Sequence, residues 1–505
     1  MMNRILLSVL LCLGMSVFSF AADKTMNTDV VVVGAGAGGT SAAFAAVDAG
    51  LKVILLEKMP ALGGSGNYME GTFAVQSKPQ IEDNIIITVE EQFKKTMEFH
   101  HWRINAKALN RWLKESSNTI DWIMANGVGI TGVKKTSPTS PRGWHMFEGG
   151  HGSSLIKAFS ERIRAKGGVI LTETPAKELI FKNGRVTGVI AEDADGNKIT
   201  VSAKAVIIAT GGFPCNEEMI KKYLNAPYKF AGAEGRMGDG IQMMEKIGVE
   251  LQNMHVVMQA GLWLYDVPTD IQFGQDGGKA KFVRLLGVLN HPYLLVSPRG
   301  ERVVDETQPL EFISNAFENV GGQGFIVFDD DTRKEFVEVG LIRGYFGMVQ
   351  RMTKFTDFDK VFAEGEKTGF AFKANSLNDL AKKTGMDAAV LNTTAATMNK
   401  LYEQRYDDQF YKDPTWLRPV KRSPFYALKG SLRMYSTTGG AKINEFFQPM
   451  TADDVVIQGL YAIGQDAGGL YGDSYDMNIG PGTASSWAIT GGRLAVEHIK
   501  STIKK

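Results

Sequence analysis

The chain has few cysteines: Cys12 and Cys215 are the only two among 505 residues. With so few, neither a disulfide framework nor a C-x-x-C-H haem attachment site is predicted. An excess of one charge is also missing, because 56 Lys and Arg balance 55 Asp and Glu. Nothing therefore indicates a nucleic acid or a membrane surface as partner. No metal site is predicted either.

Long apolar runs are absent after the first residues, so no membrane insertion is expected. The start itself, "MMNRILLSVLLCLGMSVFSFAADK", has Arg4, then an apolar run over residues 5–18, then Ser19, Ala21 and Ala22. This order predicts a secretory signal peptide over residues 1–22 and a periplasmic mature protein, in which Cys215 is a small, packed side chain. A membrane anchor is the alternative, but the run is short for one.

The rest of the chain has the composition of a globular protein, with 44% hydrophobic and 22% charged residues. Residues 29–58 predict a strand, a helix and a second strand. Strands are expected at 169–172, 179–182, 186–192 and 198–201, with hairpin turns at Asn183-Gly184 and Asp195-Gly196. Another apolar strand, "AKAVII", leads into the glycines of "ATGGF".

Residues 260–415 have a different composition, with predicted helices at 356–365 and 387–407. Glycine density rises again after Pro424. The expected fold is α/β: a split Rossmann-like domain over 23–258 and 416–505, with an α+β capping domain inserted over 259–415.

The glycine pattern after the first strand predicts a dinucleotide site. Gly34, Gly36 and Gly39 occupy the three positions of G-x-G-x-x-G, which serve a tight turn, close approach of a diphosphate, and helix packing. The helix that follows offers free N–H groups to phosphate. Glu57 ends the second strand, where it can accept hydrogen bonds from ribose hydroxyls.

Three later elements favour FAD over NAD. The loop "KMPALGGSGNYMEGTF" can follow an extended dinucleotide, and "ATGGF" is a second glycine turn. "GLYAIGQDAGG" supplies Gly464 and Asp466, which can meet ribityl or ribose hydroxyls, and a helix starting near Thr483 can point at the flavin.

These motifs resemble the flavoprotein family of soluble fumarate reductases, urocanate reductase, methacrylate-type reductases and 3-ketosteroid dehydrogenases. The matching elements are "VVVGAGAGGTSAAFAA", "LLEKMPALGGSGN", "AVIIATGGF", "GRMGDGIQMMEKIG", "PRGERVVDE", "STTGGAKIN" and "GLYAIGQDAGG". The resemblance implies an extended FAD and a cap that closes over its ring. The resemblance also implies that the FAD is bound non-covalently, since no His occupies the glycine loop. The implied contacts are Gly34, Gly36, Ala37, Gly39, Glu57, Lys58, Gly64, Ser65, Gly71, Ala176, Thr210, Gly211, Asp239, Gly464, Asp466, Thr483 and Ala484.

The resemblance weakens at the substrate site. Fumarate reductases of this type use an arginine as proton donor, with further Arg and His side chains binding both carboxylates. Here the proton-donor position is Leu310, and Ser436 replaces the usual histidine before T-x-G-G. No arginine lies between Gly472 and Thr483, where Tyr475 stands instead. Fumarate is therefore not the expected substrate.

The remaining candidates for catalysis are Arg284, Tyr475, His291 and His255. Arg284 can bind a carboxylate or form a salt bridge within the cap. Tyr475 can donate to a carbonyl or simply pack, and each histidine can be structural. Trp144, His145 and His151 are further candidates to flank the flavin, and Tyr293 is a possible proton donor.

Three functions follow. The first is an exported FAD reductase that passes a hydride from flavin N5 to the C=C bond of an α,β-unsaturated carboxylate or carbonyl compound in anaerobic respiration. Its electrons would come from a separate cytochrome c or FMN protein. The second is a dehydrogenase of a ketone-like or steroid-like substrate, and the third is a non-catalytic flavin electron-transfer protein.

Overall fold

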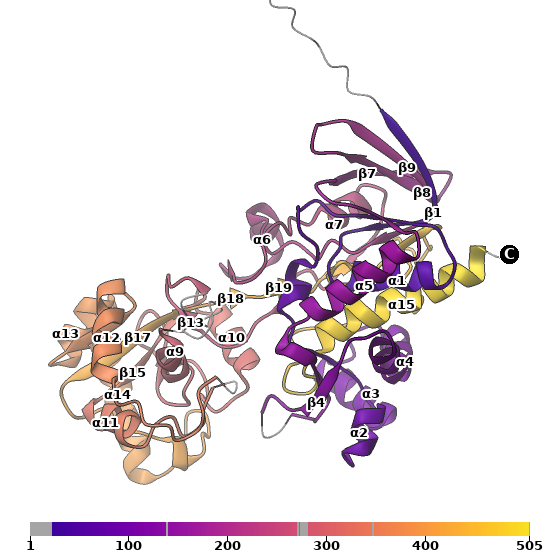
Figure 1. Cartoon of the computed structure of the whole chain (residues 1–505). Helices are drawn as coiled ribbons and strands as arrows, with labels where there is room; N and C mark the ends of the chain where they lie inside the picture. Colours follow the sequence, from indigo (N-terminus) through magenta and orange to yellow (C-terminus); the bar gives the residue numbers. More distant parts are fainter. Residues whose placement is uncertain (1–22, 138–139, 270–271, 273–280, 346–347, 504–505) are drawn as a thin grey trace, which may run out of the picture.

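The computed structural model describes residues 23–137, 140–269, 272, 281–345 and 348–503. The expected signal peptide, residues 1–22, lies outside the described residues. Within the described ranges, no helix combines the length and the apolar character needed to cross a membrane. The chain forms two lobes, each with its own sheet (Figure 1).

A seven-stranded sheet is the core of the first lobe. Its central strand ends in Val30–Val33, which are almost fully buried, as expected for a parallel strand covered on both faces. β1 pairs in parallel with β2 and β9, while β7, β8 and β9 form antiparallel hairpins. The strand order is β6 (Val169–Leu171), β2 (Val53–Leu56), β1 (Lys24–Val33), β9 (Lys198–Ile208), β8 (Arg185–Glu192) and β7 (Ala176–Lys182), with β21 (Leu460–Ala462) parallel to β9.

The hairpin turns predicted at Asn183-Gly184 and Asp195-Gly196 are confirmed, because they separate β7 from β8 and β8 from β9. One detail was wrong. The strand at 198–201 and the apolar strand "AKAVII" form one continuous strand, β9, of 11 residues. Its first half pairs with β8 and its second half with β21, so no turn is needed between them.

Helices cover this sheet (Figure 1). α1 (Ala37–Asp48) packs between α5 (Ser153–Ala165) and the C-terminal helix α15 (Thr483–Ile503). The approach of α1 and α15 is close, since a Cβ at Gly492 would lie 2.8 Å from the carbonyl oxygen of Gly38. The other elements of this lobe are η1 (Gly64–Tyr68), β3 (Gly71–Phe73), α2 (Lys78–Glu82), α3 (Val89–Phe99), α4 (Ala106–Ala125), β4 (Ile130–Lys134), β5 (Trp144–Phe147), α6 (Glu217–Tyr223), α7 (Asp239–Glu245) and η4 (Gly464–Asp466).

The second lobe is built on a mostly antiparallel sheet with a separate apolar core. The helices predicted at 356–365 and 387–407 are present there as α12 (Phe358–Thr368) and α14 (Ala388–Gln404). The remaining elements are β13 (Trp263–Leu264), α9 (Val283–Leu289), β14 (Leu295–Val296), α10 (Leu310–Glu318), β15 (Gln323–Phe328), α11 (Asp330–Glu338), β16 (Ala371–Ala374), α13 (Leu377–Thr384) and β17 (Phe425–Ser431).

Short strand pairs join the lobes. β12 (Val257–Met258) pairs with β19 (Ser436–Thr437), and β10 (Lys229–Phe230) pairs with β18 (Arg433–Met434). β11 (Leu251–Gln252) pairs with β20 (Gly440–Ala441). β17 still belongs to the second sheet, so the chain returns to the first lobe after Ser431 rather than at 416. The return is later than expected because the apolar strand β17 precedes the glycine-rich segment.

Candidate functional site

The glycine turn after β1 is shaped by backbone contacts. Gly34 has φ +98°, and a Cβ there would lie 2.3 Å from the carbonyl oxygen of Ala209. A Cβ at Gly39 would lie 1.8 Å from the carbonyl oxygen of Gly34. By contrast, a Cβ at Gly36 would meet only the Gly63 oxygen, at 3.8 Å. Gly34 and Gly39 therefore serve the turn and the helix packing, while Gly36 leaves room for a ligand.

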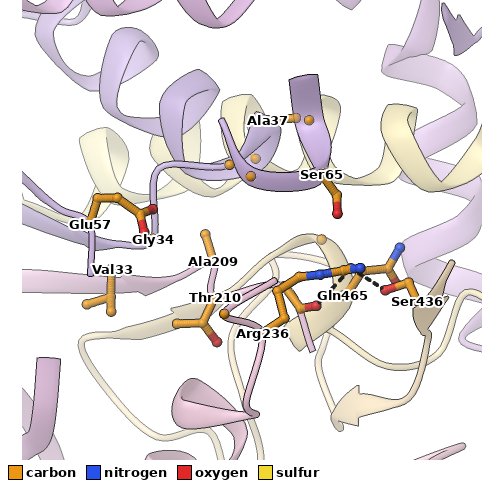
Figure 2. Close-up of a pocket in the computed structure, with 18 of the residues that line it drawn as sticks. Val33, Gly34, Ala37, Glu57, Ser65, Ala209, Thr210, Arg236, Ser436 and Gln465 are labelled. Atoms are coloured by element: carbon orange, nitrogen blue, oxygen red, sulfur yellow. Dashed lines mark hydrogen bonds between the residues drawn. The ribbon is translucent and has the colours of Figure 1, made fainter. Parts of the chain in front are cut away.

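A long pocket opens beside this turn (Figure 2). It lies between the start of α1, the β2 end and the strand pair that joins the lobes. The predicted cofactor residues that line it are Gly34, Gly36, Ala37, Glu57, Lys58, Gly64, Ser65, Ala176, Thr210, Gly211, Asp239, Gly464 and Ala484.

Four predicted cofactor residues do not line the pocket but stand next to it. Gly39 packs α1 on the glycine turn, and Gly71 approaches the backbone of His145. Asp466 is fully buried and accepts hydrogen bonds from Thr210 Oγ1 and the Gly211 backbone N, both at 2.8 Å. Thr483 Oγ1 donates to Asp476 Oδ1 at 2.6 Å. These four residues therefore contact the segments that line the pocket without lining it themselves.

The Glu57 end of the pocket carries fixed charges. Glu57 Oε2 accepts from the Ala35 backbone N at 2.8 Å, and Oε1 accepts from the Met59 N at 2.9 Å. The carboxylate is thus held in place, with further lone pairs available for ribose hydroxyls. Lys58 forms an ion pair with Asp239 on the same side.

The residues present fit an extended dinucleotide. No side chain caps the start of α1, so its first N–H groups can donate hydrogen bonds to an anion. The Ser65 hydroxyl is buried without a hydrogen-bond partner in the described part of the chain. A Cβ at Gly64 would meet nothing within 4 Å, which leaves space for a ligand against the backbone. Figure 2 shows Glu57 and Ser65 on different sides of this space.

Sequence reasoning missed Arg236, which also lines the pocket. It lies in "GRMGDG", between glycines that bring the backbone close to the ligand. Burial lowers the pKa of its guanidinium to about 10, although it stays charged at neutral pH. A cation inside a glycine-rich ligand segment was the available signal.

Most of the catalytic candidates lie elsewhere. Arg284 forms an ion pair with Asp357 on the second lobe, and its guanidinium lies 4.2 Å from the Phe355 ring centre. His255 is exposed. Neither lines the pocket, so the structure shows the cap salt bridge that was the alternative for Arg284.

His291 is buried in the second lobe against Tyr293, Phe336 and Trp416. Burial, with nearby positive charges, lowers its pKa to about 3, so the ring is neutral. Tyr293 donates to Glu335 Oε1 at 2.7 Å.

Three residues were expected to flank the flavin, and none lines the pocket. His145 is buried in β5 and bonds Ser77 Oγ at 2.6 Å. His151 is exposed, and Trp144 lies in β5 beside Gly71. Cys215 is free and half-buried.

Tyr475 lies at the junction of the lobes, close enough to Tyr435 for that residue to affect its ionisation. Burial, followed by the nearby Asp476, Glu311 and Tyr435, raises the pKa of the Tyr475 hydroxyl. Tyr435 lines the pocket, whereas Tyr475 is not among the lining residues, and burial raises the pKa of Tyr435 too. No hydrogen bond reaches either hydroxyl from the residues that the structure describes, so both phenols are neutral donors without a protein acceptor.

Two buried carboxyls stand behind these tyrosines. Glu311, in α10 of the second lobe, accepts from the Asn478 backbone N at 3.1 Å. Burial raises the pKa of Asp476 to about 7, and its Oδ2 atom has no partner among the described residues. The Glu311–Asn478 bond therefore joins the second lobe to the loop that carries Tyr475.

Asp476→Asn is expected to stabilise the protein relative to the wild type increasingly as pH rises from about 4 to about 7. The folded pKa lies above the ordinary 3.8, so the folded protein binds a proton that the unfolded chain has lost. Wild-type stability consequently falls across this window, whereas Asn cannot ionise. The measurement is the melting temperature of both proteins at several pH values.

Asp473→Asn is the matched control, three residues earlier. Burial opposes ionisation of Asp473, but hydrogen bonds and charge from His101 and Arg103 lower its pKa overall. Its contribution to stability is lost as pH falls, the opposite trend. Parallel pH curves for D476N and D473N would contradict the assignment.

Comparison with known proteins agrees with this geometry. The FAD binding domain family model matches residues 29–478. Vinyl phenol reductase of Lactiplantibacillus plantarum is 31% identical over 487 residues, covering 94% of this chain and 97% of its own. Fumarate reductase (cytochrome) of Shewanella frigidimarina is 30% identical, covering 95% of this chain and 78% of its own.

The fold agrees as well. A crystal structure of 3-ketosteroid delta1-dehydrogenase from Sterolibacterium denitrificans superposes with a TM-score of 0.73 at 19% identity, covering 94% of this chain and all of the other. The α/β fold class with a capping domain is thereby confirmed. The chain belongs to the FAD-binding family of reductases and dehydrogenases that act on the C=C bonds of unsaturated compounds, together with vinyl phenol, fumarate and urocanate reductases and 3-ketosteroid dehydrogenases.

Proposed function

We propose that this protein is an exported FAD-dependent reductase of a C=C bond conjugated to a carbonyl or to a single carboxylate, and that fumarate is not its substrate. The observation that carries the proposal is the pair of tyrosines at the junction, the buried Tyr475 and the half-buried Tyr435, whose hydroxyls form no hydrogen bond with the described residues. They occur in a chain with Leu310 and Ser436 at positions where related fumarate reductases have charged side chains.

The chemistry of these side chains selects the substrate class. Bound FAD would supply the hydride equivalent. Tyr435 would donate a hydrogen bond to the oxygen of the activating group, which draws electrons away from the alkene. Burying a carboxylate without a cation costs several kcal/mol, so two carboxylates are a poor match for two phenols. One uncharged or singly charged group fits them better.

Tyr475 is also the proposed proton donor to the second alkene carbon. It stays protonated because burial and nearby carboxyls raise its pKa. Asp476 and Glu311, whose pKa values are raised by burial, are protonatable groups near Tyr475. Leu310 cannot donate a proton.

The relatives support this substrate class in part. Vinyl phenol reductase, by its name, reduces a substrate that lacks two carboxylates, and it matches this chain over nearly its whole length.

We further propose that FAD is bound without a covalent link, because η1 and its flanking loop contain no histidine. Release of free FAD by denaturation tests this directly.

Electron supply and location belong to the same proposal. The described lobes contain no haem-attachment motif, so a separate cytochrome c or FMN protein would deliver electrons. The cytochrome in the name of one relative is in line with such a donor. Export would place the enzyme in the periplasm with it, and N-terminal sequencing of the mature chain should find a start near Ala22 or Asp23.

A dehydrogenase of a ketone-like substrate is the second candidate. Tyr475 precedes Gly480-Pro481-Gly482, as a tyrosine does in 3-ketosteroid dehydrogenases, and a phenol can polarise a ketone in either direction. The direction of the reaction can be measured. If the protein is a reductase, it should turn over an enone with reduced viologen and show little turnover of the saturated ketone with an artificial electron acceptor.

The test of function is an anaerobic assay with reduced methyl viologen and a panel of alkenes. Enones and unsaturated mono-acids should be reduced with many turnovers per protein, and fumarate at a rate near background. A flavin electron-transfer protein without catalysis would oxidise viologen only in the presence of a protein acceptor. Turnover of fumarate comparable to that of the best alkene would overturn the proposal.

A further inference from the structure

Arg236 is a buried cation that forms no salt bridge with the residues that the structure describes. Its side chain is 9% exposed. Nη1 donates to Ser436 Oγ at 2.9 Å, and Nη2 donates to the Tyr435 carbonyl oxygen at 2.7 Å. Nη1 also has a longer contact, 3.4 Å, with the Gly211 oxygen. All three acceptors are neutral and no described residue forms a salt bridge with it, while the buried Asp466 acts on it only through longer-range charge, so the guanidinium has no direct counter-ion.

Arg236 also has guanidinium N–H groups that form no hydrogen bond with the described residues. A guanidinium carries five N–H groups, and the contacts above use three of them. Nε is buried and has no partner in the described part of the chain. The Phe230 ring covers the guanidinium at 4.8 Å. Buried donors without acceptors are costly, which points to an anionic ligand in the pocket.

The position of Arg236 selects which anion this is. The start of α1 is available to bind the diphosphate, and Glu57 is available to bind the ribose. Neither group of the cofactor therefore requires Arg236. The Arg236 side chain runs away from Glu57 toward Ser436 and Gln465 (Figure 2). This is the end of the pocket left for the flavin ring system.

We propose that Arg236 raises the reduction potential of the bound FAD. When the ring takes up two electrons and one proton it gains one negative charge, which a nearby buried cation stabilises relative to the neutral oxidised ring. Charge interactions are strong here because the site excludes water. The electrons come from the one-electron carrier protein in the cell, or from dithionite in the test. The inference rests on FAD binding and is independent of the substrate.

The test is a spectroelectrochemical titration of the FAD-loaded wild type, Arg236→Gln and Arg236→Lys at one pH. Removing the charge should shift the equilibrium constant for reduction at least about tenfold toward oxidised FAD, which is about 30 mV for a two-electron couple. The Lys variant should keep most of the wild-type potential, because it keeps the charge.

Lys58→Gln is the matched control. Lys58 is also a cation that lines the pocket, but it is paired with Asp239 at the Glu57 end. Its loss should weaken FAD binding without moving the potential. An unchanged potential in Arg236→Gln with weaker binding of both redox states would overturn the proposal and assign Arg236 to the diphosphate. Equal shifts in the Gln and Lys variants would also overturn it, since geometry rather than charge would then matter.

If Arg236→Gln does not fold, Ser436→Asp and Ser436→Asn replace it. Asp places a carboxylate at the atom to which Nη1 already donates, and so neutralises Arg236 in place. Asn has a similar size but no charge. The potential should fall in the Asp variant only, and an unchanged potential in Ser436→Asp contradicts the proposal.

Discussion

Gly39→Ala is expected to yield a destabilised protein that does not retain FAD. The added Cβ would lie 1.8 Å from the Gly34 carbonyl oxygen and 3.3 Å from the Ala209 Cβ, so the backbone itself must move. Overpacking of this kind costs roughly 1–3 kcal/mol or more. It also displaces the start of α1 from the glycine turn. The measurements are the melting temperature and the ratio of FAD to protein after gel filtration.

Alanine variants of two other glycines distinguish an effect on folding from an effect on FAD binding. Gly36 has an ordinary φ of −71°, and its Cβ would have room, so Gly36→Ala should fold normally but bind FAD weakly. Gly50 has φ +79° and no atom near its Cβ, so Gly50→Ala should lose about 1–2 kcal/mol to backbone strain but keep FAD. Full FAD content in Gly39→Ala would show that this turn does not shape the cofactor site.

Tyr475→Phe should lower kcat/KM for the best alkene by roughly 2–4 kcal/mol in transition-state free energy, the scale of one lost donor in a preorganised site. The change removes only the hydroxyl, so the buried ring still packs against Tyr471, 5.6 Å away. FAD content and melting temperature should stay close to those of the wild type. Steady-state kinetics with reduced viologen provide the measurement.

Arg284→Ala is the control for that experiment. Arg284 pairs with the partly exposed Asp357, and such surface ion pairs contribute only about 0–1 kcal/mol to stability. The kcat/KM of the Arg284→Ala variant should therefore match that of the wild type. Loss of activity in Arg284→Ala together with normal activity in Tyr475→Phe would mean that the substrate binds on the second lobe instead of at the junction.

The cofactor half of the site was predictable because its signals are local in the sequence. Gly34, Gly36 and Gly39 are held by backbone geometry within one turn, and Glu57 follows at the end of the next strand. Such patterns depend on a few neighbouring residues, so they can be recognised before the fold is known. The strands of the first sheet were predictable for the same reason, since buried parallel strands are nearly continuous apolar runs.

The substrate half was harder, because it is assembled from segments far apart in the chain. Arg284 and His291 are chemically suitable, yet the second lobe uses one for an ion pair and buries the other. Tyr435 gave no motif of its own, and Arg236 lies in a glycine motif that does not show where its side chain points. Their role depends on β12 and β19 pairing at the junction, a tertiary contact that local periodicity does not encode.

Reoxidation of the reduced protein by single alkenes tests the central claim most directly. The FAD-loaded protein is reduced anaerobically with one equivalent of dithionite and mixed in a stopped-flow instrument with 3-buten-2-one, with acrylate or with fumarate. The account predicts rapid return of the oxidised flavin absorbance with at least one of the first two alkenes, and none above background with fumarate. Rapid reoxidation by fumarate, with no response to the others, would contradict it.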